Sequence, residues 1–349
     1  MHLSRRHVQW IVVAVAAVAA AALLVGCCCT HPGTTTYVEA PAPSATQDLK
    51  PPPGVTASDS TTLVEMQGVH FRIDPRLALQ IRRLRGRMEP LPGHDVIDFG
   101  ESESFVIDIA TAEVGLTPEN MLYLFNRYVL NYPDAPLSLQ AMSTVDGYLV
   151  QRGTLHKIVD IPFEMKAEMT ATADGRILLH PVAMEICGIP GRGLMEALGV
   201  ELEDLLDLSD APGLDVEGND LLADPREFLP PPALRGHIAD VRIEEDLVVQ
   251  IFDSGEAVVI PPPSDPAARN YMFFFGGTLA FGKLFMVQAD LQIIDQDPGD
   301  PLDFFLQNYM EQLVAGHSET TPDAGLIAVF PDYDDIAETR DVGGDAGVR

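Results

Sequence analysis

Residues 161–171 read IPFEMKAEMTA, and apolar residues alternate with mostly polar ones along the whole stretch. In an extended chain, successive side chains point to opposite faces, so this period of two gives one apolar and one wet face. A strand with one buried face is typical of an antiparallel sheet. We therefore predict that residues 161–171 form such a strand.

The same alternation continues on both sides of this stretch. Residues 105–110 alternate in the same way, and Asp146-Gly147 and Asp174-Gly175 stand between strand-like runs. Asp-Gly between two alternating runs is a strong hairpin signal. We expect an antiparallel meander between residues 104 and 187.

One helix interrupts the predicted meander. Thr117 is a suitable N-cap, Pro118 suits the first helical position, and apolar residues surround much of the segment 117–130. A helix with so broad an apolar surface is expected to be enclosed by other elements. The sequence thus predicts an α+β fold in which a strongly curved antiparallel sheet is wrapped around this helix.

Strands and helices are also predicted further along the chain. An amphipathic helix is expected within residues 194–206. Asp300-Pro301 is expected to start a last helix, because Leu302, Leu306 and Leu313 keep helical spacing. Strands are predicted at 238–243, 247–252, 257–260, 271–275 and 285–293.

Residues 72–87 are basic. Six arginines and one aspartate give this segment a net charge of +5, and Asp74-Pro75 resembles a helix start. Leu77, Ile81, Leu84 and Met88 have helical spacing, so an amphipathic helix is predicted over 75–87. Two interpretations remain open, contact with anionic lipid headgroups and docking on the acidic body of the protein. The candidate headgroup contacts are Arg82, Arg83 and Arg85.

The amino terminus has the layout of an export signal. Two arginines precede an apolar run at 10–25, and Leu24-Val25-Gly26-Cys27 closes that run. The run is short for a spanning helix, which needs about 20 apolar residues. The pattern resembles a bacterial lipobox, which implies a lipidated Cys27 and an exported lipoprotein facing the periplasm, at the outer membrane rather than the inner one.

The expected domain organisation follows from composition. Residues 1–26 are the signal, and the Pro/Thr/Ala-rich residues 27–64 are a disordered tether because they lack large apolar side chains. Residues 65–335 form the folded domain, with a sub-boundary near 265, and 336–349 form a disordered tail.

The charge of the chain excludes one class of partner. The formal net charge is −30, and removal of residues 1–26, with two arginines and no acids, makes it −32. Such a chain is not expected to bind nucleic acid, because it would be repelled by the phosphates. A protein partner is not identified by the sequence.

No catalytic motif is found. Gly-x-Ser-x-Gly, His-Glu-x-x-His and phosphate-loop patterns are absent. Asp253-Ser254-Gly255 is interpreted as a turn, and Cys187 as a small buried apolar residue. An acidic cluster does not fit a calcium loop, and three histidines lack metal spacing. The acids are Asp295, Asp297, Asp300 and Asp303, and the histidines are His156, His180 and His237. We expect no catalytic residue, cofactor or metal.

The apolar residues provide the candidate binding site. A curved sheet around a helix encloses either a packed core or an apolar groove. Methionine suits a groove that adapts to varied chains. The candidate lining residues are Met121, Phe125, Tyr128, Phe163, Met165 and Met169.

The order of the segments also resembles a known family. GRILLHPVAMEI at 175–186 leads through a Gly-Pro turn into an amphipathic helix, and LPPPAL at 229–234 leads to IADVRI at 238–243 and LVVQIF at 247–252. Over roughly residues 100–255 this order resembles the LmeA-like phospholipid-binding family, whose shape is similar to the tubular lipid-binding superfamily. The resemblance implies an elongated, curved sheet around a helix with acyl chains between them, and no catalytic residues. Residues 75–87 and 270–333 depart from the family.

These observations lead to one expectation of function and two alternatives. The expectation is a membrane-anchored periplasmic lipoprotein that binds or transfers phospholipid, or another acyl-chain ligand, in an apolar groove. The first alternative is a non-catalytic envelope scaffold with a solid core. The second is an exported hydrolase, which would need titratable residues gathered in a cleft.

Overall fold

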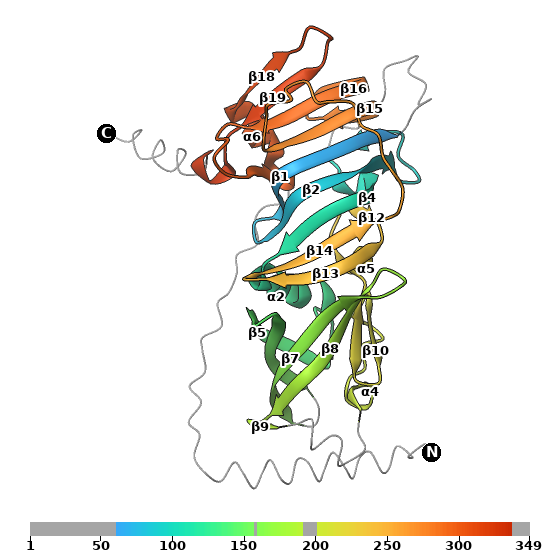
Figure 1. The fold of residues 1–349 in the computed structure, drawn as a ribbon, viewed down its shortest axis with the longest axis vertical. Helices are drawn as coiled ribbons and strands as arrows, with labels where there is room; N and C mark the ends of the chain where they lie inside the picture. The colour runs from blue at the N-terminus through green and yellow to red at the C-terminus, as the bar shows by residue number, and fades with distance from the viewer. Residues whose placement is uncertain (1–60, 157–158, 191–200, 337–349) are drawn as a thin grey trace, which may run out of the picture.

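The computed structural model describes residues 61–156, 159–190 and 201–336, which form an elongated body (Figure 1). Two sheets follow one another along its long axis, and a short helical segment lies between them. The predicted lipobox and most of the predicted tether and tail lie outside the described residues.

The larger sheet has 12 strands, nine of which form a continuous path. Along this path the strands are β13 (Ile238–Glu244), β14 (Leu247–Asp253), β4 (Phe105–Leu116), β2 (Leu77–Pro90), β1 (Thr62–Asp74), β15 (Tyr271–Phe281), β16 (Leu284–Asp295), β19 (Leu326–Phe330) and β18 (His317–Thr320). Three short strands pair beside it in parallel: β3 (Ile97–Asp98) with β15, β12 (Ala233–Arg235) with β4, and β17 (Leu302–Phe305) with β1. The hairpins along the path make the sheet mainly antiparallel.

The smaller sheet has seven strands and contains the predicted meander from residue 137 to residue 186, whereas the strand predicted at 105–110 belongs to β4 of the larger sheet. Its order is β10 (Leu214–Glu217), β11 (Asp220–Ala223), β8 (Ile177–Ile186), β7 (Asp160–Ala171), β6 (Tyr148–His156) and β5 (Leu137–Val145), with β9 (Ile189–Pro190) beside β8. Asp146-Gly147 joins β5 to β6 with positive φ at both residues, and Gly175 has φ 81° between β7 and β8. Both predicted hairpins are therefore confirmed.

The predicted helix at 117–130 is also confirmed. Helix α2 (Pro118–Leu124) continues into one π-helical stretch, η2 (Phe125–Val129). The Thr117 hydroxyl accepts a hydrogen bond from the Asn120 amide at 3.1 Å, as expected of an N-cap. Other helices among the described residues are α4 (Leu202–Leu205), α5 (Pro225–Phe228) and α6 (Tyr309–Ala315), with 3-10 turns η1 (Ser102–Ser104) and η3 (Leu306–Asn308), and residues 333–336 are also helical.

The fold is α+β with large, mainly antiparallel sheets, as the alternating runs predict. The prediction of one strongly curved sheet is wrong, because the strands divide into two sheets and neither is strongly curved or closed on itself. The alternation of side chains indicates which face of a strand is buried, but it does not indicate which strands share a sheet.

The prediction of a basic helix over 75–87 is wrong, because β1 and β2 form a long hairpin there. Asp74 Oδ1 accepts hydrogen bonds from the amides of Arg76 and Leu77 at 2.8 and 2.9 Å, which is the aspartate turn that Asp-Pro also favours. A bulge in β2 puts Arg82 and Arg83 side by side on the outer face.

The bulge explains the misleading pattern. The inward residues of β2 are 77, 79 and 81 before it and 84, 86 and 88 after it. The one-residue shift at the bulge leaves apolar side chains at 77, 81, 84 and 88, which is also helical spacing.

Four further predictions are corrected. Thr62 begins β1, so the strand starts inside the predicted tether. Leu302 begins β17, and the last helix begins only at Tyr309. Residues 257–260 form no strand. Only Leu202–Leu205 of the predicted helix at 194–206 is helical, while residues 191–200 lie outside the described residues.

Cys187 is exposed, so its prediction as a buried residue is also wrong. Cys187 and Gly188 have φ values of 53° and 73°, and the flanking Ile186 and Ile189 are paired. Positive φ at both central residues is the geometry of a two-residue hairpin turn. The turn carries the cysteine away from the core.

Aromatic rings fill the core of the larger sheet near β3. Phe99 is 3% exposed and lies within 6.2 Å, between ring centroids, of five other rings. These rings belong to Phe105, Phe274, Phe281, Phe304 and Tyr309. This end of the sheet is therefore filled by close ring contacts.

Candidate ligand-binding cavities

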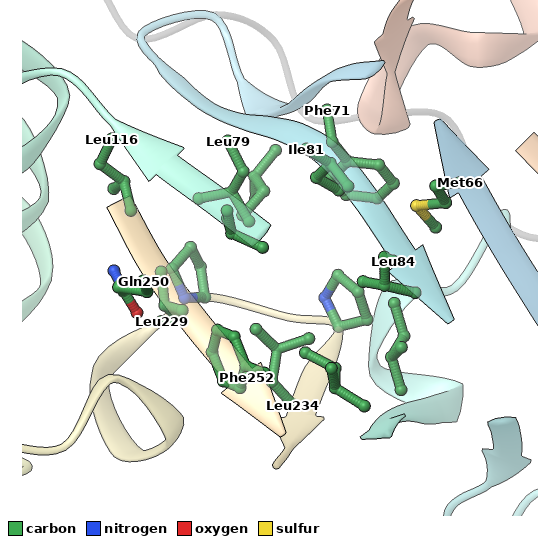
Figure 2. Close-up of a pocket in the computed structure, with 16 residues that line it drawn as sticks. Met66, Phe71, Leu79, Ile81, Leu84, Leu116, Leu229, Leu234, Gln250 and Phe252 are labelled. Carbon is green, nitrogen blue, oxygen red and sulfur yellow. The ribbon is translucent and has the colours of Figure 1, made fainter. Parts of the chain in front are cut away.

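The first candidate site is a cavity inside the larger sheet, which we call the upper cavity (Figure 2). Side chains of β1, β2, β4 and β14 and of the segment 229–234 line it, including Met66, Phe71, Leu84 and Phe252. Its volume is about 40 Å³. Gln250 is the one polar residue among the 16 that line it.

A second cavity, the middle cavity, lies where α2 and α5 meet the ends of both sheets. Met121 of α2, Val248 of β14 and Met169 of β7 contribute to its wall, and its volume is about 30 Å³. It shares three wall residues with the upper cavity, namely Leu116, Leu229 and Gln250. The two cavities are therefore neighbours with a common wall.

A third cavity, the lower cavity, lies inside the smaller sheet. Its volume is about 60 Å³, and Gln151 is the one polar residue among the described residues of its wall. It shares Phe125, Leu179 and Ala223 with the middle cavity. The three cavities thus follow one another from the larger sheet, past α2, into the smaller sheet.

The cavities are small compared with a lipid. A cavity needs about 10–15 Å³ to hold one water molecule, so each of the three has room for only a few. A long chain would enter only if wall side chains moved. The middle and lower walls carry Met121, Met165, Met169 and Met184, and methionine is unbranched and changes rotamer readily.

The two glutamines are the exceptions in an apolar interior. Gln250 is 7% exposed and Gln151 is 6% exposed. Neither side-chain amide makes a hydrogen bond to any residue that the structure describes. A buried amide without a partner costs about 1–3 kcal/mol. The fully buried, unpaired side-chain polar atoms of the described residues belong to Tyr132, Asp295 and Asp303, so each glutamine amide keeps some accessible surface in its cavity and bears only part of this cost.

The structure brings most of the predicted lining residues together. Met121 and Met169 line the middle cavity, Phe163 and Met165 line the lower one, and Phe125 lines both. Their contact with a ligand remains a prediction.

Tyr128 does not line any of these cavities. Its hydroxyl donates a hydrogen bond of 2.6 Å to Asp74 Oδ2. Burial, followed by this hydrogen bond, raises the pKa of Tyr128 above its usual range. The residue connects the π-helical stretch to the β1–β2 hairpin.

Sequence reasoning missed the upper cavity and both glutamines. Two of the upper cavity's strands, β1 and β2, were not predicted as strands. The sequence does contain a signal for Gln250, because this residue lies between Val248 and Phe252, at an inward position of an alternating run. A polar residue at an inward position of a strand is uncommon, so it indicates a candidate binding residue.

The predicted headgroup contacts lie on the outer face of the larger sheet, in ion pairs. Arg82 contacts Glu113 and Glu244 at 2.8 Å each, Arg83 contacts Glu113 at 3.2 Å, and Arg85 contacts an oxygen of Glu65 at 3.1 Å. These acids offset much of the positive charge, so the arrangement favours docking on the acidic body. Contact with headgroups remains a prediction, for which Arg83 is the best placed because its side chain is 76% exposed.

The acidic cluster near β16 is not arranged as a metal site. Among the described residues, no group of three or more His, Cys, Asp or Glu side chains could hold a metal ion. Burial, together with the nearby acids, raises the pKa of Asp295 to about 7, although the hydrogen bond from the Asp297 amide acts to lower it. Asp253 accepts a hydrogen bond from the Gly255 amide at 2.8 Å, consistent with the predicted turn.

The fold and its cavities define a class: an elongated α+β protein with an apolar interior that extends through both sheets. No protein-family model, no curated protein and no solved structure matches the chain. Within the described residues, no helix is long and apolar enough to cross a membrane. Cys27 lies outside the described residues.

Proposed function

We propose that the protein binds the acyl chains of a phospholipid, or of a similar ligand, in the three successive cavities. The observation that carries the proposal is the shared walls. Gln250 and two leucines connect the upper cavity to the middle one, and Phe125, Leu179 and Ala223 connect the middle cavity to the lower one. Three neighbouring apolar voids suit a long chain better than a compact ligand, which a single deep pocket would hold.

In this proposal, the bound chain lies between α2 and the two sheets. Side chains of α5 and of both sheets would then surround the ligand and α2 together, which would complete the predicted enclosure of the helix. The resemblance to the LmeA-like family supports an acyl ligand between a helix and a sheet. A lipidated Cys27 and the tether that precedes β1 would hold the domain close to the outer membrane, facing the periplasm.

The test is native mass spectrometry of protein purified under gentle conditions from a bacterial envelope. We expect adducts with the mass of one phospholipid, and we expect delipidated protein to take up phospholipid from vesicles. Protein that carries no adduct and takes up no lipid would contradict the proposal. That result would favour a solid-core scaffold lipoprotein.

A pair of matched variants tests the location of the ligand. Ala223→Leu adds three carbons at the wall between the middle and lower cavities. Ala78→Leu makes the same change on the outer side of β2, outside the three walls. We expect only Ala223→Leu to reduce lipid uptake, with thermal unfolding used to check that both variants are folded.

A further inference from the structure

The two buried glutamines occupy equivalent settings in the two sheets. Gln250 lies on the inward face of β14 between Val248 and Phe252. Gln151 lies on the inward face of β6, two residues from the fully buried Leu149. Among the described residues that line its cavity, each is the one with a polar side chain. Figure 2 shows the Gln250 amide among apolar side chains at the upper cavity.

Packing does not explain a glutamine at either position. Leucine would fill a similar volume without a polar group, and leucines occupy neighbouring wall positions in both cavities. More than nine-tenths of each glutamine is buried, and neither amide is hydrogen-bonded to a residue that the structure describes. A polar side chain that is buried, unpartnered and part of a cavity wall is suited to bind a polar group of a ligand.

The two amides lie at different places along the cavities. Gln250 belongs to the common wall of the upper and middle cavities, whereas Gln151 belongs to the lower cavity. A ligand that extends through all three cavities would therefore meet one amide, then an apolar middle section, and then the second amide.

We infer that the glutamine beside the glycerol end of the bound lipid, Gln250 or Gln151 according to the direction in which the lipid lies, determines the specificity of the cavities by donating hydrogen bonds to the ester carbonyl oxygens at that end. This inference rests on the proposed function and refines it. The ligand class is an acyl ester, and a lipid of the same shape without carbonyl groups is bound less well. An ether oxygen is a weaker acceptor, so an ether lipid would leave the amides unsatisfied.

The size of the effect follows from the free energy of an unpaired buried amide. Loss of one such hydrogen bond lowers affinity by about 5- to 150-fold. Binding sites that are built to hydrogen-bond a ligand discriminate strongly against analogues without the bonding group, because the site's own polar groups are left unpaired.

The experiment compares two probes with delipidated protein. The probes are a dipalmitoyl phosphatidylcholine, which has two ester carbonyls, and the dihexadecyl ether phosphatidylcholine, which has none. Affinities are measured by displacement of a fluorescent fatty acid. We expect the wild type to prefer the ester by at least about 5-fold. We expect one of the two variants Gln250→Leu and Gln151→Leu, the one beside the glycerol end of the bound lipid, to abolish that preference, and the double variant to abolish it as well.

Thermal unfolding and a surface variant provide the controls. Each of the two inward Gln→Leu changes is expected to leave the unfolding temperature unchanged or to raise it, since an unpaired buried amide is removed. Gln80→Leu makes the same change on the outer side of β2 and should keep the full ester preference.

The outcomes separate the inference from the proposed function. Equal affinity of the wild type for both probes would overturn the inference and leave lipid binding intact. An undiminished ester preference in the folded double variant would also overturn it. Failure of both probes to bind would overturn the proposed function and the inference together.

Discussion

The hydrogen bond between Tyr128 and Asp74 is predicted to attach the π-helical stretch to the β1–β2 hairpin. The Tyr128 hydroxyl donates to Asp74 Oδ2 at 2.6 Å, while Oδ1 of the same carboxylate accepts from the Arg76 and Leu77 amides. Tyr128→Phe removes only the first bond, whereas Asp74→Ala removes all three. The two substitutions therefore measure different numbers of bonds at one carboxylate.

The magnitudes follow from the bonds removed. All three bonds end on the charged Asp74 carboxylate, and a hydrogen bond to a charged group contributes about 1.5–3 kcal/mol. Because Tyr128 is only half-buried, we expect Tyr128→Phe to cost about 1.5 kcal/mol. We expect Asp74→Ala to cost about 4–5 kcal/mol, which corresponds to three such bonds at the low end of that range.

The assay is thermal and urea unfolding of both single variants and the double variant. In a chain of this size 1 kcal/mol corresponds to a shift of about 2 °C in Tm. The double variant should be no less stable than Asp74→Ala alone, because Tyr128 then has no partner to lose. Strictly additive losses would refute the reasoning.

Tyr132→Phe is the matched control for this prediction. The Tyr132 hydroxyl is buried and makes no hydrogen bond in the part of the chain that the structure describes. Its removal should leave stability unchanged or increase it. A loss as large as that of Tyr128→Phe would show that the phenol matters through packing, and the hydrogen-bond argument would fail.

Four further changes test other parts of the structure. Phe99→Ala should cost about 3–5 kcal/mol in urea unfolding, because the ring lies among five others; a loss below about 1 kcal/mol would contradict the packing. Asp295 has a pKa raised to about 7, so its ionisation lowers stability as pH rises from about 4 to 7. The Tm of the wild type should therefore fall between pH 5 and pH 7.5, and the Tm of Asp295→Asn should fall less; an equal fall would contradict this. Gly277→Ala should destabilise, since φ is +60° and the added Cβ would meet a threonine hydroxyl; an unchanged Tm would contradict this. Cys187 should react with a maleimide in the folded protein as readily as in urea, and protection in the folded state would contradict its exposed position.

Local patterns predicted the smaller sheet well. Residues 161–171 lie within β7, and the two Asp-Gly turns connect strands as expected. These features depend on interactions between residues close in sequence, where side-chain alternation and turn geometry are sufficient. Helix α2 was predictable for the same reason, because its cap and first-turn proline are local.

The larger sheet was harder to predict because its strands are irregular and distant in sequence. The bulge in β2 reproduces helical spacing, and β1 pairs with β15 about 200 residues away. Five of the six predicted lining residues lie in cavity walls, but the walls also need segments such as 229–234, whose position depends on long-range packing. The shared walls could not be deduced from alternation alone.

The middle cavity has a mechanical consequence. Leu116 and Val248 of the larger sheet and Met169 and Leu179 of the smaller sheet lie in one wall around α2. A chain bound there would contact both sheets at once and would restrict the movement of one sheet relative to the other. Since a ligand stabilises the state that binds it, loading would stiffen this junction, and amide hydrogen exchange in α2 would slow when the cavity is filled.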